Sequence, residues 1–235
     1  SRDVLNILRF GKTVARRITI AEGQTIQEIL TRLDATEGLT GTVEKIPEQG
    51  SLLPETYHFS YGDDRNQLLF RMEKAMRETL NRLWATRSPG LPYQSPWEAV
   101  IMASIIEAET GLAEERARVA GVFLNRLRIG MRLQSDPTVA FAITNGAKPL
   151  DRSLTRRDLR VSHPYNTYTN RGLPPGPITN PGRAAIEAAL HPAETEDLYF
   201  VADGTGGHVF SRTLAEHKKN VSIWRKLKRQ NAEKP

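Results

Sequence analysis

Hydrophobic residues recur with a helical period in several separate stretches of the chain. The longest stretch is residues 64–86, where apolar side chains three or four positions apart form one face: Leu68, Leu69, Met72, Met76, Leu80 and Leu83. Residues 2–10 show the same pattern on a smaller scale and stop at Gly11. Residues 13–20 alternate as a half-buried strand does. The N-terminal part therefore predicts helices together with at least one strand.

Residues that begin and end helices set the limits of the next elements. Thr25 followed by Glu28 forms a capping box, which predicts that a helix begins there. Residues 36–65 are rich in turn formers and predict a loop with one short extended piece. Two further helices are predicted at about 97–109 and 113–129, with a glycine between them.

The C-terminal half has fewer regular signals. Residues 131–143 predict a strand or loop that runs into a short apolar segment, and residues 144–181 contain six prolines and little periodicity. A short helix at 182–190, a strand at 198–202, a hairpin-like stretch and a basic tail helix complete the pattern. These elements predict an α+β fold: a mainly helical domain with short strands and long Pro-rich loops.

Composition narrows the chemistry. The 235 residues include no cysteine, which excludes disulfides, zinc–thiolate sites and a cysteine nucleophile. No apolar run reaches the length of about 20 residues that spans a bilayer, and no signal peptide is visible. The chain starts inside a helical pattern, so we expect a fragment from which a targeting or membrane segment has been removed.

The positive charge is concentrated at the C-terminal end. From Thr205 onward eight lysines and arginines face two glutamates, which equals the formal net charge of +6 for the whole chain. Such a tail helix could meet nucleic acid, anionic lipid or an acidic polymer, or simply be a solvated face. The sequence leaves these alternatives open.

Two glutamates close the predicted helix at 97–109. On a helical wheel with Ile105 at zero, Glu109 lies near 40°, inside the apolar arc, whereas Glu107 lies near 200°, opposite it. We therefore expect Glu107 in solvent and Glu109 in or beside the core. Burial and the helix C-terminus both raise the pKa of a carboxyl group, and a carboxylic acid that is neutral near pH 7 suits a general acid.

A structural role for Glu109 is the competing interpretation. Here the carboxylate would be a partly buried helix-end group paired with a nearby arginine, such as Arg126, Arg128 or Arg132. The local pattern does not decide between the two roles.

The loops that follow are rich in groups that bind sugars. Residues 163–182 combine prolines with tyrosine, asparagine and threonine, which offer aromatic faces and neutral hydrogen bonds. Such a set suits sugar hydroxyls and N-acetyl groups better than phosphates. A surface loop immobilised by proline is the plainer alternative.

Four long motifs together carry a family resemblance: "ASIIEAET", "VFLNRLRIGMRLQSDPTV", "YNTYTNRGLPPGPI" with "NPG", and "YFVADGTGGHVFSRTLAEH". Over about residues 13–225 the chain resembles the endolytic murein transglycosylases, the YceG-like (MltG-type) family of bacteria. The resemblance implies an α+β catalytic domain at 47–235, preceded at 1–46 by the end of a small LysM-like region.

The function that the resemblance implies is a lyase reaction on the cell wall. Family members cleave peptidoglycan strands between N-acetylmuramic acid (MurNAc) and N-acetylglucosamine (GlcNAc) endolytically and without water. They leave 1,6-anhydromuramic ends and terminate strand elongation, with roles in cell-wall biogenesis and cell shape. The family pattern assigns catalysis to Glu109.

The resemblance also implies a cellular setting. A single N-terminal anchor would hold the protein in the bacterial inner membrane, with the catalytic part in the periplasm beside peptidoglycan synthases. That anchor is absent here, so this chain would be a soluble fragment. No cofactor, metal or nucleic-acid partner is implied, and the five histidines show no helical i, i+4 pair.

The predicted substrate-binding residues are spread over the motifs: Gln134, Asp136, Thr138, Tyr165, Asn166, Tyr168, Glu55 and His208. Glu55 stands where the family usually has aspartate. For each residue a hydrogen bond that only stabilises a loop is an equal alternative. A peptidoglycan-binding module without catalysis, and a nucleic-acid-binding protein that uses the basic tail, are the other classes of function to be tested.

Overall fold

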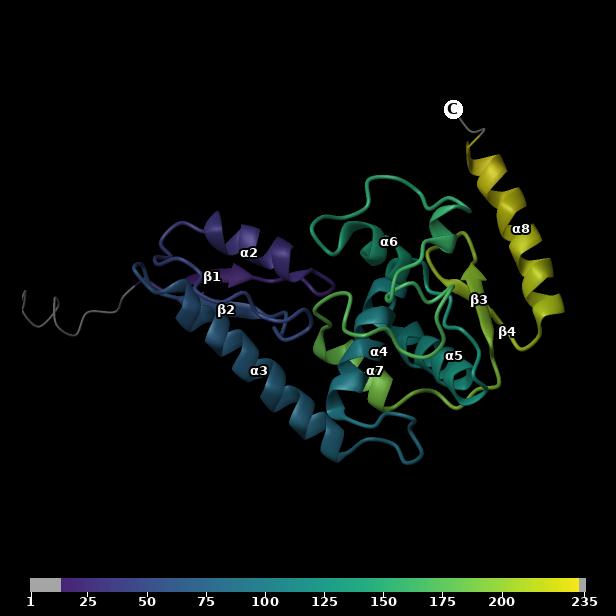
Figure 1. Cartoon of the computed structure of the whole chain (residues 1–235), viewed down its shortest axis with the longest axis horizontal. Coiled ribbons are helices and arrows are strands. Elements are labelled where there is room, and N and C mark those ends of the chain that lie inside the picture. Colours follow the sequence, from purple (N-terminus) through teal and green to yellow (C-terminus); the bar gives the residue numbers. More distant parts are fainter. Residues whose placement is uncertain (1–13, 233–235) are drawn as a thin grey trace, which may run out of the picture.

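Two hydrophobic cores divide residues 14–232, the part of the chain that the computed structural model describes, into a smaller N-terminal unit and a larger helical unit (Figure 1). The predicted helix at 2–10 lies outside the described residues. The elements of the smaller unit are β1 (Arg16–Thr19), α2 (Ile26–Asp34), β2 (Thr56–Phe59) and the first turns of α3 (Arg65–Ala85). The larger unit contains α4 (Pro96–Glu109), α5 (Arg116–Arg128), α6 (Asp136–Thr144), α7 (Arg183–Leu190), β3 (Tyr199–Ala202), β4 (His208–Ser211) and α8 (Leu214–Ala232).

The smaller unit is a two-stranded sheet packed against helices. β1 and β2 pair antiparallel, with Arg16 opposite Phe59, and α2 begins at the predicted capping box. Thr25 accepts a hydrogen bond from the backbone of Glu28, and the Glu28 carboxylate accepts one from the Thr25 backbone N–H at 2.8 Å. The predicted strand and helix are confirmed.

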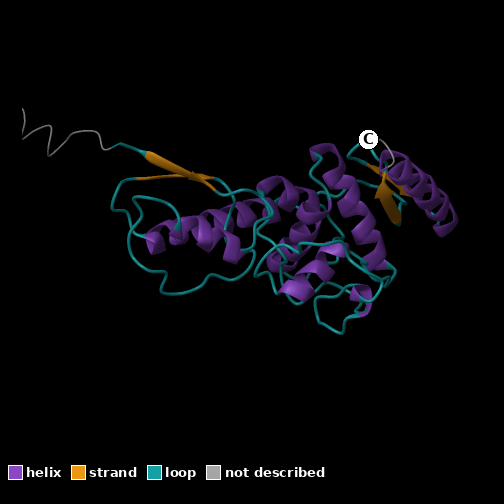
Figure 2. Cartoon of the chain, turned by 90° about the horizontal axis from the view of Figure 1, so that it is seen from above, coloured by secondary structure: helices purple, strands orange, loops and turns teal. Residues whose placement is uncertain are grey.

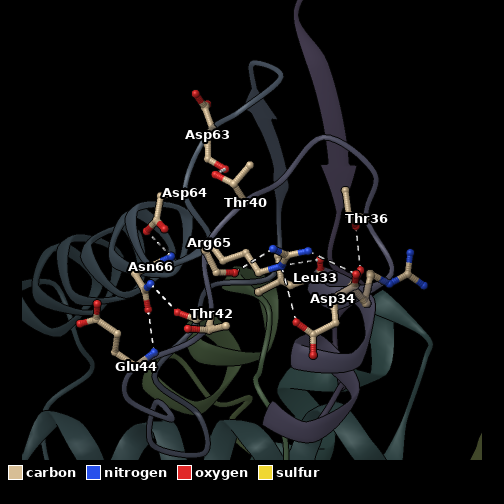
Figure 3. A network of polar contacts seen from close by, with 12 residues as sticks. Leu33, Asp34, Thr36, Thr40, Thr42, Glu44, Asp63, Asp64, Arg65 and Asn66 are labelled. Atoms are coloured by element: carbon tan, nitrogen blue, oxygen red, sulfur yellow. Dashed lines mark hydrogen bonds and ion pairs between the residues drawn. The ribbon is translucent and has the colours of Figure 1, made fainter.

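Arg65 and Asn66, at the start of α3, hold the loops of the smaller unit (Figure 3). The Arg65 guanidinium donates to the carbonyl oxygens of Leu33 and Asp34 at the end of α2. Asn66 donates to the Thr42 carbonyl and accepts from the Glu44 backbone N–H at 3.0 Å. These bonds satisfy carbonyl oxygens at the end of α2, and a carbonyl and an N–H group in a loop where no regular secondary structure pairs them.

The core of the smaller unit continues past residue 46, where the sequence predicted a domain boundary. It contains Leu52, Tyr57 and Met72 together with residues of α2. α3 then runs into the larger unit, where Met76 and Leu80 join the second core (Figure 1). The predicted helix and its apolar face are confirmed, and one helix serves both cores.

α4 is the central element of the larger unit. All residues from Ala99 to Ile106 are buried, and α4 contacts α3, α5, α6 and α7. Ser95 caps the helix, and Pro96 lies in its first turn, where no intrahelical N–H is needed. Figure 2 shows that helices make up most of this unit and that the strands lie toward the two ends of the molecule.

The C-terminal elements are a β-hairpin and a long helix. β3 and β4 pair antiparallel, with Tyr199 opposite Ser211, as the sequence predicted. α8 packs on this hairpin: the His217 ring stacks on Tyr199, and the Asn220 amide donates to the Ser211 hydroxyl at 3.0 Å. No helix among the described residues is long and apolar enough to cross a bilayer.

Of the two alternatives predicted for the start of residues 131–143, the loop is observed, at 131–135. The apolar segment that follows is the helix α6, with Pro137 in the first turn and Val139 and Ala142 buried. The apolar run was too short for its period to distinguish a buried helix from a strand. Residues 145–182 contain no regular element except a 3₁₀ turn at Asp158–Arg160, as expected for this proline-rich stretch.

Asn180 joins the two units. Its side-chain oxygen accepts from the backbone N–H groups of Gly50 and Leu52, both at 3.1 Å, and its amide donates to the Gln24 carbonyl at 2.9 Å. Gly50 has a φ of +86°, and a Cβ there would lie 2.5 Å from Pro177, so only glycine fits. Asn180 thus fixes the smaller unit against the larger one.

We expect Asn180→Ala to lower the free energy of unfolding by about 2–4 kcal/mol, because two buried N–H groups would lose their acceptor. Urea unfolding measures the effect. Asn81→Ala, an exposed change on α3, is the control and should be nearly neutral. Equal stabilities for the two variants would contradict the role of Asn180 as the residue that holds the two units together.

Candidate active site

A cavity of about 490 Å³ opens where α4 ends. Its walls come from the end of α4, the segment before α6, the β3–β4 hairpin and α8. The polar residues that line it are Glu109, Arg126, Gln134, Asp136, Tyr168, Tyr199, His208 and His217. Parts of the chain that are far apart in sequence therefore place a carboxyl group among aromatic and hydrogen-bonding side chains.

Glu109 is the last residue of α4 and faces this cavity. The Ser135 hydroxyl donates to Glu109 Oε1 at 2.5 Å. Burial raises the pKa of Glu109 to about 7, and the nearby Asp136 carboxylate acts in the same direction, against the Ser135 hydrogen bond and the charges of His208 and Arg126. Glu109 is thus a carboxyl group that exchanges its proton near neutral pH.

Arg126 does not neutralise Glu109 through an ion pair. Its side chain is buried, 6% exposed, and its guanidinium donates to the carbonyl oxygens of Leu133 and Leu198. Among the described residues no arginine or lysine lies within ion-pair distance of Glu109. The structural alternative, a helix-end carboxylate paired with Arg126, Arg128 or Arg132, is therefore not the observed arrangement.

Glu107 is buried, and the prediction that it faces solvent is wrong. Its side chain is 5% exposed and lies 3.3 Å from the Arg116 guanidinium. Its second oxygen accepts from the Gly182 backbone N–H at 2.8 Å. Arg116 and the Gly182 backbone cover the side of α4 that the wheel assigned to solvent. This glutamate is a structural ion pair, whereas Glu109 has no cation partner.

The segment before α6 is held in a strained conformation. Gln134 has a φ of +50°, in the left-handed region, which residues other than glycine adopt at a cost of about 1–3 kcal/mol. The backbone N–H groups of Gln134 and Ser135 donate to the carbonyl and hydroxyl oxygens of Thr167, and the Thr138 and Thr167 hydroxyls are 2.8 Å apart. This backbone conformation places the Ser135 hydroxyl against Glu109 and Gln134 in the cavity wall.

Asp136 and Tyr168 form a second polar pair in the wall. The Tyr168 hydroxyl donates to Asp136 Oδ1 at 2.6 Å. Burial and the Asp136 carboxylate raise the pKa of Tyr168, so its phenol stays neutral and remains a donor. Asp136 lies at the N-terminus of α6, where free backbone N–H groups favour an anion.

His208 is oriented by Glu115. Its ring Nδ1 lies 2.7 Å from Glu115 Oε2, and its backbone N–H donates to Glu115 Oε1 at 2.7 Å. The Thr110 hydroxyl, next to Glu109 in the chain, also donates to Glu115. Because a carboxylate only accepts, Nδ1 carries the proton, which leaves Nε2 as the ring nitrogen available to a ligand.

Four of the predicted binding residues, Gln134, Asp136, Tyr168 and His208, line the cavity with Glu109. Two others do not reach it. Thr138 and Asn166 are fully buried, and their side chains bond the backbone around Ser135 and the carbonyl of Val161. Thr138 and Asn166 therefore hold loops, which the sequence had left as an equal alternative.

Tyr165 and Glu55 also lie away from the cavity lining. The Tyr165 ring packs 4.7 Å from Phe141, centroid to centroid, and is partly buried against the larger core. Glu55 is exposed in the smaller unit, where its backbone carbonyl accepts from Ile20. In this structure neither side chain is brought to Glu109.

Sequence reasoning missed Ser135, Glu115 and Trp224. Ser135 stands inside the motif that contains Gln134 and Asp136, but hydroxyl residues are common in turns and its contact with Glu109 spans 26 positions. Glu115 lies in a 3₁₀ turn and meets His208 across 93 positions. No local pattern carries such long-range contacts.

A larger groove of about 670 Å³ adjoins the cavity. Asp136 and Trp224 line both spaces, while Gly23 and Thr25 of the smaller unit line the far side of the groove. Among residues 14–232 no three His, Asp or Glu side chains are grouped as metal ligands would be. The arrangement suits a long polar ligand that passes a carboxyl group able to donate and accept a proton.

Comparison with known proteins gives one family for the chain. The YceG-like family matches residues 1–223. The endolytic murein transglycosylase of Bacillus subtilis (strain 168) is 43% identical over 177 residues, which are 74% of this chain and 47% of that protein. The protein of the same name from Streptococcus pneumoniae serotype 2 is 35% identical over 179 residues, 74% of this chain and 32% of its own length.

One solved structure is similar over most of the chain. The crystal structure of a yceG-like protein, lmo1499, from Listeria monocytogenes has a TM-score of 0.69 and 34% sequence identity. The match covers 93% of this chain and 80% of the Listeria chain. The chain thus spans less than half of the named transglycosylases but most of the solved domain.

We expect Glu109→Gln to stabilise the protein at pH 8 but not at pH 4.5. The raised pKa means that burial favours the neutral acid, so wild-type stability is lost as the pH rises from 4.5 through 7. A neutral amide avoids this loss, which would amount to about 3 kcal/mol. Urea unfolding at both pH values measures it.

Glu107→Gln is the matched control for this experiment. It should lower stability at pH 8, because the Arg116 guanidinium would lose a charged partner, and less so at pH 4.5, because burial raises the pKa of Glu107 and favours its neutral form there. A Glu109→Gln variant that is no more stable than wild type at pH 8 would show that Glu109 is an ordinary ionised carboxylate.

Proposed function

The chain belongs to the YceG-like family, and on this premise we propose that it is an endolytic lytic transglycosylase of peptidoglycan. The bond cut would be the one between MurNAc and GlcNAc, with formation of a 1,6-anhydromuramic end and no use of water. The named relatives are endolytic murein transglycosylases. The observation that carries the proposal is the position of Glu109 in a cavity large enough for sugars. This carboxyl group has a pKa of about 7 and no cation partner among the described residues.

Glu109 would first act as the acid. Its neutral form would donate a proton to the glycosidic oxygen as the bond to C1 of MurNAc breaks. The Ser135 hydroxyl occupies Oε1, so the transferable proton belongs on Oε2. The positive charge that develops on the sugar ring would be stabilised by the N-acetyl carbonyl and by the Asp136 carboxylate.

Glu109 would then act as the base. The ionised carboxylate would take the proton from the C6 hydroxyl of the same sugar as that oxygen bonds to C1. The 1,6-anhydro ring closes, and Glu109 returns to its neutral form. A pKa near 7 suits both steps, because the group must give up a proton and regain one at similar pH.

The remaining wall residues would position the sugar. Gln134 offers an amide, and His208 offers Nε2 while Glu115 fixes its ring. Tyr168 holds the Asp136 carboxylate in one orientation. These groups could fix the N-acetyl arm and the C6 hydroxyl without ionising, which matches the neutral chemistry of the substrate.

The wider setting follows the family. We infer that the smaller unit is LysM-like and that the full protein carries an N-terminal anchor in the inner membrane, with this domain in the periplasm. There it would cut strands made by neighbouring peptidoglycan synthases and end their elongation. The groove that adjoins the Glu109 cavity and is lined by Gly23 and Thr25 of the smaller unit supports a strand longer than one disaccharide.

Incubation of the protein with purified sacculi is the direct test. Wild type should release muropeptides with 1,6-anhydro ends, and Glu109→Gln should reduce the release at least a thousandfold, because the acid and the base are lost together. Glu114→Gln, an exposed glutamate five positions along the chain, should keep wild-type activity.

The products distinguish the competing functions. Reducing MurNAc ends would show hydrolysis, with Asp136 activating water as the second carboxylate of a glycosidase does. Sacculus binding without any soluble product would show a binding module. Binding to nucleic acid that falls steeply with salt would favour a nucleic-acid-binding protein.

The pH dependence of kcat/KM should follow the proton on Glu109. Activity should fall about tenfold per pH unit above pH 7, because only the neutral acid can donate. Ser135→Ala removes a hydrogen bond that stabilises the charged form of Glu109, so the fall in activity should begin at a higher pH. A fall that begins near pH 4.5, or one that Ser135→Ala does not move, would contradict the assignment.

A further inference from the structure

α8 forms a wall of the groove beside the candidate active site. It lies on the outer side of the β3–β4 hairpin (Figure 1), held by His217 and Asn220. Trp224, one to two turns further along, is partly buried and lines both the cavity with Glu109 and the adjoining groove. It therefore lies where a strand would pass between the two spaces.

The residues of α8 that line these spaces share one face. At about 100° per residue, Leu214, His217, Trp224 and Lys228 fall within an arc of about 80°. Lys226 points about 160° away from the middle of that arc. The helix thus presents an aromatic ring and one lysine to the groove, whereas Lys219 and Lys226 lie on the opposite side.

Lys228 combines a position in the groove with a position over the tryptophan. Its ammonium lies 5.2 Å from the centroid of the Trp224 ring, and the side chain lines the groove. Lys148 lines the same groove, and neither lysine forms an ion pair within residues 14–232. Arg152, also in the lining, is already bound to Asp158 at 2.6 Å.

The acidic groups of the groove are occupied. The Glu28 carboxylate belongs to the capping box of α2, and Asp136 accepts from Tyr168. The groove is therefore lined by an aromatic ring and by two ammonium groups without a carboxylate partner among the described residues. A flat apolar ring suits the face of a sugar, and ammonium groups suit carboxylates.

We propose that Trp224 and Lys228 form a subsite for peptide-bearing glycan: Trp224 stacks on a sugar of the strand, and Lys228, with Lys148, binds carboxylates of the attached stem peptide. This rests on the proposed function, because it takes peptidoglycan as the ligand. It assigns the substrate form as strands that still carry their peptides, because the peptide carboxylates give both lysines a partner, which a glycan without carboxylates would not.

The same geometry favours peptidoglycan over an anionic membrane as the partner of this face. A membrane-binding helix would turn its aromatic and apolar side chains away from the protein. Here Trp224 is directed into the groove and is in contact with the cavity lining. Lys226, on the opposite face, provides the comparison between the two partners.

Binding measured in the inactive Glu109→Gln protein tests the subsite without turnover. The probes are labelled uncrosslinked strands with their stem peptides and chitin oligosaccharides, which are β-1,4-linked N-acetylglucosamine and carry no carboxylate. Trp224→Ala should raise Kd about tenfold for both probes, because a central aromatic contact is lost, and Trp224→Phe should recover most of the loss. Circular dichroism shows whether α8 stays folded.

Lys228→Ala should raise Kd only about threefold for peptide-bearing strands, because a partly exposed ion pair contributes little. It should leave the Kd for chitin oligosaccharides unchanged, because these carry no carboxylate. This difference should shrink as salt is raised. Lys226→Ala is the matched control and should change neither value. Equal effects of Lys226→Ala and Lys228→Ala, or no effect of Trp224→Ala, would overturn the subsite.

Two further outcomes separate the proposals. If wild type releases anhydro ends while Trp224→Ala and Lys228→Ala bind strands as their parent does, the subsite is wrong and the proposed reaction stands. If wild type releases none while strand binding depends on Trp224, the reaction is wrong and the subsite stands. Loss of binding to phosphatidylglycerol vesicles in both lysine variants, with strand binding unchanged, would assign the face to membranes.

Discussion

The structure depends on the burial of the middle of α4. Every residue from Ala99 to Ile106 is covered by protein, because four other helices pack around this one. Two carboxyl groups at its end must therefore enter an environment that disfavours charge. Glu107 meets this constraint with Arg116 and the Gly182 backbone, whereas Glu109 has no cation partner among the described residues and its pKa is raised to about 7. The helix thereby creates one structural and one reactive carboxyl group.

The local part of this organisation was readable from the sequence. Periodicity predicted α3 and its buried face, the Thr25–Glu28 box predicted the start of α2, and position at a helix end predicted a raised pKa for Glu109. These features depend on residues within one or two helical turns, so a single sequence contains the information.

The rest depends on contacts between distant segments. A helical wheel assumes that one face of the helix meets water. In α4 the side that carries Glu107 is covered by Arg116 and Gly182, so the prediction for Glu107 was wrong. Ser135 reaches Glu109 because Thr167 fixes a strained backbone 32 positions away. Half of the predicted binding residues reach the cavity, since the others bond loops or pack in the cores. Side-chain type suggested sugar chemistry, but only packing decides which hydroxyl or amide is left for a ligand.

The attachment of α8 has a topological consequence for a polymer substrate. A bond in the interior of a strand has no nearby end, so such a strand cannot be threaded lengthwise into a closed tunnel and must be laid in from the side. The wall opposite α4 is a single helix docked on a two-stranded hairpin, and most of its side chains are exposed. Such an element can move aside with the loss of few buried contacts, while the α4 wall stays rigid. In the proposed reaction, the α4 wall would hold the reactive group in a fixed position, and a displacement of α8 would be the movement that admits the interior of a strand.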